Sequence, residues 1–111
     1  MKITTQNNTS IIQFSPISID EILEQITAEI TNLTKQNTIV DLSENQLVSA
    51  KNISGFLKIA QAYKKAKKSF VVVVASDFDF NHASDKINIV PSLQEAHDMI
   101  EMEEIERDLG F

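Results

Sequence analysis

Residues 38–74 constrain the fold of this chain more than any other stretch. An apolar strand that begins at residue 38 ends in Asp41, Leu42 and Ser43, an amphipathic helical pattern follows, and the apolar run 70–74 comes next. Two strands joined by a helical crossover form a βαβ unit, in which the strands are parallel. An unbroken β-branched run is typical of a strand buried on both faces. We therefore predict an α/β sheet with residues 70–74 near its centre.

The segments before this unit add a hairpin and a helix. Residues 3–5 and 10–14 read as two short strands around a polar turn, which predicts a β-hairpin. Residues 19–33 carry an apolar stripe at helical spacing, and Ser18 with Glu21 forms a capping-box pattern in front of it. We expect one helix of about four turns here, packed on the sheet.

The segments around and after the unit complete the sheet. The helix of the βαβ unit is expected to begin near Ser49 or Ser43, either of which has a hydroxyl suited to an N-cap. The polar stretch 77–85 predicts a single helical turn or none, and residues 87–90 another strand. A last helix should begin after Ser92. The predicted fold is a single α/β domain, a mixed four- to five-stranded sheet with helices packed mainly on one face.

Composition excludes several classes of protein. The chain has 111 residues, which suits one domain, and no cysteine, so disulfides, thiol nucleophiles and cysteine-based metal sites are excluded. We expect no membrane insertion and a cytoplasmic location, because the amino terminus lacks an apolar leader pattern and the longest apolar run is too short to span a bilayer. The net charge of −6 argues against nucleic acid as a partner.

Charge is segregated between two helical segments. The lysines of the middle helix are Lys51, Lys58, Lys64, Lys65, Lys67 and Lys68, and the acids of the last segment are Glu95, Asp98, Glu101, Glu103, Glu104, Glu106 and Asp108. Two interpretations stand: both helices present solvated faces, or the acidic helix steers a basic partner. Met102, Ile105 and Leu109 share one stripe of this segment, which makes a homodimer through the carboxyl-terminal helix a second expectation.

The residues that chemistry would need are sparse. Asp77, Asp79 and Asn81 match the start of a calcium-binding loop, but His82 stands where that loop requires glycine. His97 borders an apolar face, where packing is the commoner role. There is no nucleophile–base pair and no glycine-rich phosphate loop, so we expect no enzyme, no metal and no cofactor. A small-ligand or nucleotide sensor that uses the amino terminus of the Lys51 helix stays as the alternative function.

The Asp41-Leu42-Ser43 strand end and the sequence Val-Pro-Ser-Leu-Gln-Glu-Ala at 90–96, in the order of elements given above, resemble the STAS family. These are the domains of bacterial anti-sigma factor antagonists and of sulfate-transporter tails. The resemblance covers roughly residues 9–102. It implies the fold predicted above and a regulatory protein–protein interaction module, or a subunit of a larger assembly such as a lipid-transport complex.

The family places an Asp-Ser-Ser-Gly-Leu-Gly-like helix start after that strand, and a kinase phosphorylates the second Ser. Matched without gaps, Ser49 takes the position of the Asp and Lys51 that of the phosphorylated Ser. Lysine cannot accept phosphate as serine does, so the usual phospho-switch is not expected. A shift of one or two residues would make Ser49 the phosphoacceptor. The resemblance implies that a protein partner docks at this helix start, on Asn45, Ser49, Lys51, Asn52, Ile53 and Ser54.

Overall fold

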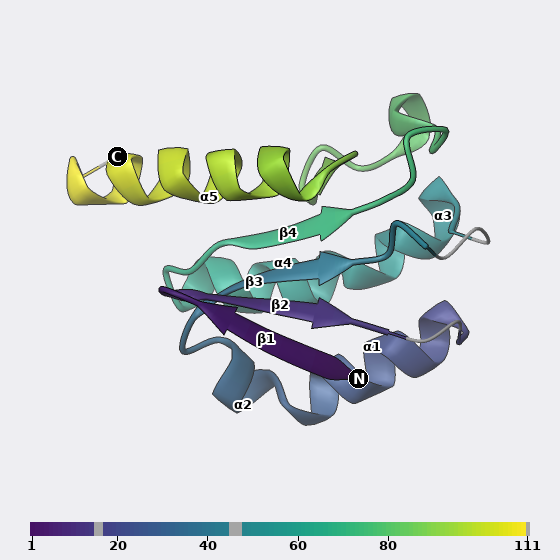
Figure 1. Ribbon diagram of the computed structural model, residues 1–111, viewed down its shortest axis with the longest axis horizontal. Coiled ribbons are helices and arrows are strands. Elements are labelled where there is room, and N and C mark those ends of the chain that lie inside the picture. Colours follow the sequence, from purple (N-terminus) through teal and green to yellow (C-terminus); the bar gives the residue numbers. More distant parts are fainter. Residues whose placement is uncertain (15–16, 45–47, 111) are drawn as a thin grey trace.

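The computed structural model describes residues 1–14, 17–44 and 48–110 (Figure 1). In this part of the chain the strands form a five-stranded sheet of order β1-β2-β3-β4-β5. The strands are β1 (Lys2–Gln6), β2 (Thr9–Gln13), β3 (Asn37–Asp41), β4 (Phe70–Val73) and β5 (Asn88–Val90). The first pair is antiparallel and the other three pairs are parallel. The predicted α/β fold with a mixed sheet is confirmed, and β4 lies inside the sheet with all four residues buried.

Two of the predicted helices are interrupted, whereas the last one is continuous. The helices are α1 (Ile19–Ala28), α2 (Ile30–Leu33), α3 (Ala50–Ile53), α4 (Leu57–Lys65) and α5 (Leu93–Asp108), with the 3-10 turns η1 (Ser54–Phe56) and η2 (Phe80–His82). The first predicted helix is interrupted at Glu29, and the helix of the βαβ unit is interrupted by η1. The polar stretch 77–85 forms the single turn η2, as predicted.

The backbone of η1 lies close to α1. A Cβ atom on Gly55 would lie 2.7 Å from Cδ1 of Leu23, so the backbone of η1 approaches α1 at a distance that a glycine allows. Phe56, the next residue, is fully buried. The turn therefore brings an aromatic ring into the core between α1 and the sheet.

The sheet has two hydrophobic layers. On one face Ile22 of α1, together with Ile53 and Phe56, packs in one cluster with Val40 and Val72. On the other face the cluster joins Ala96 and Ile100 of α5 to Ile11, Ile39, Val71, Val73 and Val90. Helices α1 to α4 thus share one face, whereas α5, the longest described helix, covers the opposite one. Figure 1 shows α5 running beside β4, away from α1 and α2.

Candidate functional site

The predicted docking surface at the start of α3 is held by a reciprocal cap. The Ser49 Oγ accepts a hydrogen bond from the backbone N–H of Asn52 (3.3 Å) and donates one to its Oδ1 (2.8 Å), which also accepts from the N–H of Ser49 (3.3 Å). Of the two predicted caps, Ser49 is the one used. Both side chains are exposed. Two amide groups at this helix start are therefore already bonded within the chain.

The other residues of that surface differ in exposure. Lys51 and Ser54 are exposed, and the Ser54 hydroxyl donates to the carbonyl of Lys51 (2.6 Å). Ile53 is fully buried in the core and offers no surface for the apolar contact expected of it. Its burial follows from its place on the inner side of α3, facing the sheet. Asn45 lies outside the described residues.

An aromatic pair, with one ring in the turn η2 and one just before it, lies near α3. Phe78 is buried and Phe80 is exposed, with their rings edge to face at 5.2 Å between centroids. A hydrogen bond with the His82 ring lowers the pKa of Asp79. In the described ranges no group of three acidic or histidine side chains is placed to hold a metal ion. Phe78 thus serves the core, and Phe80 is the exposed ring of the pair.

A row of large apolar side chains lies on the outer face of α5. Met102, Ile105 and Leu109 are 62%, 53% and 68% exposed, opposite the face on which Ala96 and Ile100 are buried. The exposed acids Asp98, Glu101, Glu106 and Asp108 lie on the same side of the helix or next to the row. Exposed apolar side chains that gather in one row and have a charged border are typical of protein contact surfaces. We call these three residues the α5 row.

A polar network that no sequence motif indicates holds α5 on the sheet. Asn37 is the first residue of β3 and Ser69 directly precedes the neighbouring strand β4. Both are buried, and the Asn37 Oδ1 accepts a hydrogen bond from the backbone N–H of Ser69 (2.8 Å). The Asn37 Nδ2 donates to Glu104 (2.7 Å), and the Ser69 hydroxyl donates to Glu103 (2.5 Å). Arg107 donates to Ser69 Oγ (3.2 Å). Two acids assigned above to a solvated or partner-steering face therefore bind the chain itself.

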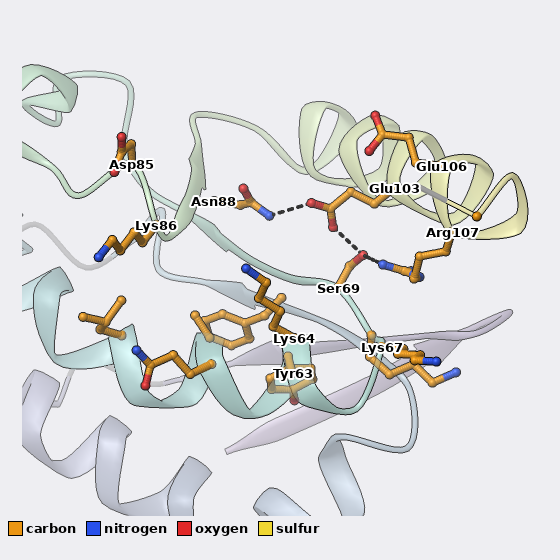
Figure 2. A pocket seen from close by; sticks show the side chains of 16 residues that line it. Tyr63, Lys64, Lys67, Ser69, Asp85, Lys86, Asn88, Glu103, Glu106 and Arg107 are labelled. Carbon is orange, nitrogen blue, oxygen red and sulfur yellow. Dashed lines mark hydrogen bonds between the residues drawn. The ribbon is translucent and has the colours of Figure 1, made fainter.

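Beside this network a cleft of about 1040 Å³ opens between α4 and α5 (Figure 2). Its floor includes Leu57, Ala60 and Phe70, and its charged lining residues come from α4, from the approach to β5 and from α5. The charged residues are Lys64, Lys67, Lys68, Asp85, Lys86, Glu103, Glu106 and Arg107. The only signal in the sequence was the segregation of lysines and acids into two helices, because no motif marks this cleft.

The fold is that of a small α/β protein with a mixed five-stranded sheet. No protein-family model matches the chain, and a search of curated proteins finds no match. Within residues 1–14, 17–44 and 48–110, no helix has the length and apolar character that crossing a membrane requires.

Proposed function

We propose that the protein is a non-enzymatic, STAS-like protein–protein interaction module that acts in the cytoplasm, as a regulator or as a subunit of a larger assembly. The observation that carries the proposal is the α5 row. Three large side chains, each more than half exposed, share one helix face. Burying them against a partner would remove apolar area from water, at about 25 cal/mol per Å².

The acids beside the row indicate the chemistry of the partner. Asp98, Glu101 and Glu106 are exposed beside it. A partner with an apolar patch bordered by lysines or arginines would complement both features. A second copy of this chain would bring two acidic helices together, which costs electrostatic energy at low salt. A different, basic protein is therefore the preferred partner, and the homodimer through α5 is the alternative occupant.

The surface at the start of α3 is the second candidate for the same function. Ser49, Lys51, Asn52 and Ser54 are exposed there, but the polar groups of Ser49 and Asn52 pair with each other, and Ile53 is buried. This surface offers polar contacts without an apolar centre. Protein contacts that contribute most energy lie in an apolar centre, so the α5 row is the stronger of the two.

Affinity capture from a lysate of the source organism tests the two surfaces against each other. The baits are the wild type, Ile105→Glu, and the double variant Lys51→Glu/Asn52→Asp, each checked for an unchanged melting curve. We expect a partner that the wild type and the double variant retain and that Ile105→Glu loses. A partner that only the double variant loses would place the contact at the start of α3. A partner that both Ile105→Glu and the double variant retain would exclude both surfaces.

Sedimentation velocity of the purified protein then identifies the occupant. A wild type that stays monomeric supports the basic partner. If the wild type instead dimerises and Ile105→Glu is monomeric, the occupant of the α5 row is a second copy, and the proposal of a different partner fails.

A further inference from the structure

We propose that the cleft between α4 and α5 binds an organic phosphate of about nucleotide size. The lining contains no residue of the α5 row or of the start of α3, so the inference goes beyond the proposed function. A volume of about 1040 Å³ is at the upper end of the range of small-molecule sites. Four features of the lining indicate the ligand.

The first feature is an excess of positive charge from separate elements. Lys64 belongs to α4, Lys67 and Lys68 follow it, Lys86 precedes β5, and Arg107 belongs to α5. Three acids also line the cleft, but both oxygens of Glu103 already accept hydrogen bonds, from Ser69 (2.5 Å) and Asn88 (3.1 Å). Among the described residues no lysine forms an ion pair with a carboxylate. Five cations against three acids leave the lining with an excess of positive charge, which favours a ligand with more than one negative charge.

The second feature is the fixed position of Arg107. Its guanidinium donates to the Ser69 hydroxyl (3.2 Å) and to the Asn37 Oδ1 (3.5 Å), and both of these residues are buried. Figure 2 shows the side chain lying beside Ser69 at one end of the cleft. An arginine held in this way loses little side-chain entropy when it binds an anion.

The third feature is the backbone of Lys67. Its φ angle is +59°, in the left-handed region, directly after Ala66, the C-cap of α4. Glycine or asparagine usually occupies this position, because a side chain is strained there. The chain carries a lysine instead, and Lys67 is one of the residues that line the cleft.

The fourth feature is the apolar floor. Leu57 and Ala60 are half-buried residues of α4, and they line the cleft together with the buried rings of Tyr63 and Phe70. Figure 2 shows Lys64 extending from the same helix toward α5. An inorganic anion would leave this floor in water, whereas a ligand with an apolar body would cover it. The geometry therefore fits a phosphate joined to a flat or apolar group.

Titration calorimetry with ATP, AMP and inorganic phosphate as probes tests the site on the full chain. The cleft variant is Lys64→Gln/Lys67→Gln. The matched control is Lys58→Gln/Lys65→Gln, which removes the same charge from two exposed lysines of α4 that do not line the cleft. We expect the wild type and the control to bind ATP more tightly than phosphate, and the cleft variant to bind ATP at least about tenfold more weakly than the wild type.

Three results would overturn the inference: no heat from any probe up to about 10 mM, equal weakening in both double variants, or equal affinity for ATP and phosphate. Equal weakening would mean that net charge alone attracts the anion. The outcome is independent of the capture experiment, since neither double variant touches the α5 row or the start of α3.

Discussion

Among the described residues, Tyr63 is the largest fully buried side chain. Its hydroxyl is 2.6 Å from Oγ1 of the buried Thr38, and its ring stacks on Phe70 at 5.0 Å between centroids. This one side chain thus joins α4 to both β3 and β4. The polar end of a buried tyrosine needs such a partner, because an unpaired hydroxyl in the core costs free energy.

Replacing Tyr63→Phe should lower the free energy of unfolding by about 1 kcal/mol, because it removes the hydrogen bond and leaves the Thr38 hydroxyl with one fewer partner. Urea denaturation measures the change. The variant Thr38→Val and the double variant complete a cycle that isolates the bond. Strict additivity of the two single changes would contradict a direct interaction between the two hydroxyls.

Because Tyr63 is buried, we expect the free energy of unfolding to fall at high pH. Burial raises the pKa of Tyr63 to about 12 in the folded protein, against an ordinary value of 10.0. Between these values the unfolded chain releases the phenolic proton and the folded chain keeps it, so the free energy of unfolding falls as pH rises from 10 toward 12. The full loss is about 2 to 3 kcal/mol. Tyr63→Phe lacks the group, and its stability should fall less steeply over this range. Parallel slopes would contradict the assignment.

At Lys67 the backbone conformation predicts a gain in stability. The variant Lys67→Gly should have a free energy of unfolding about 1 kcal/mol higher than the wild type, because glycine adopts the left-handed region without strain. Urea denaturation measures this change. Lys67→Ala removes the same charge but keeps a Cβ atom, and it should not gain. If glycine and alanine have equal effects, charge and not conformation sets the stability at this position.

At the scale of elements, the attachment of α5 is the feature that most needs an explanation. Its first half is held by apolar contacts of Ala96 and Ile100, whereas the second half depends on the network of Asn37, Ser69, Glu103, Glu104 and Arg107. Hydrogen bonds between charged and neutral groups, such as these, are among the stronger ones in proteins. The two halves of one helix are therefore stabilised by different interactions.

The variant Asn37→Ala should separate the two halves. It removes the bond to Glu104 and leaves the buried N–H of Ser69 without its acceptor, at a cost of about 1 to 3 kcal/mol. In hydrogen exchange, amides beyond residue 101 should exchange faster than in the wild type, while those near Ile100 keep more of their protection. Gln94→Ala, on the exposed face of α5, is the control. Equal acceleration along all of α5 would show that the helix detaches as one unit.

The apolar pattern of the sequence predicts the elements well and their interruptions poorly. The hairpin, β4 and the helix start at Ser92 follow from local signals, which are periodicity, β-branched residues and capping side chains. The break at η1 was missed although Gly55 is a local helix-weakening signal, and the close approach of Gly55 to Leu23, two residues far apart in the sequence, has no local signal. Strand patterns also do not state which face of a sheet a later helix covers, so the place of α5 was missed.

The candidate sites likewise include one that the sequence pattern indicates and one that it does not. The α5 row was visible as an apolar stripe, because its three residues recur at helical spacing. The network beneath it was not, since Asn37 and Ser69 carry no periodic signal and their partners are 67 and 34 residues away. Two acids in the last helix with an arginine one turn later were a clue to such an anchor. Ile53 was misassigned because the family motif gives a position in the sequence and not its burial.

At the scale of the whole molecule, the inner and outer sides of α5 have separate roles. The inner side and its polar anchor fix the helix on the sheet, and the outer side carries the α5 row. The variant Ile105→Glu should therefore change the free energy of unfolding by no more than about 0.5 kcal/mol, as exposed positions usually do. Chemical denaturation measures it. A loss of several kcal/mol would mean that Ile105 supports the fold, and the α5 row would then not be a free surface.

Site-specific photo-crosslinking in the source organism tests the central claim most directly. A photoreactive amino acid replaces Ile105 on the α5 row, Lys51 at the start of α3, or Lys58 on the exposed side of α4, and the adducts are identified by mass spectrometry. We expect one dominant protein adduct from position 105, to a partner with a basic surface, and little adduct from position 58. An adduct from position 51 and none from position 105 would contradict the assignment of α5 as the contact surface.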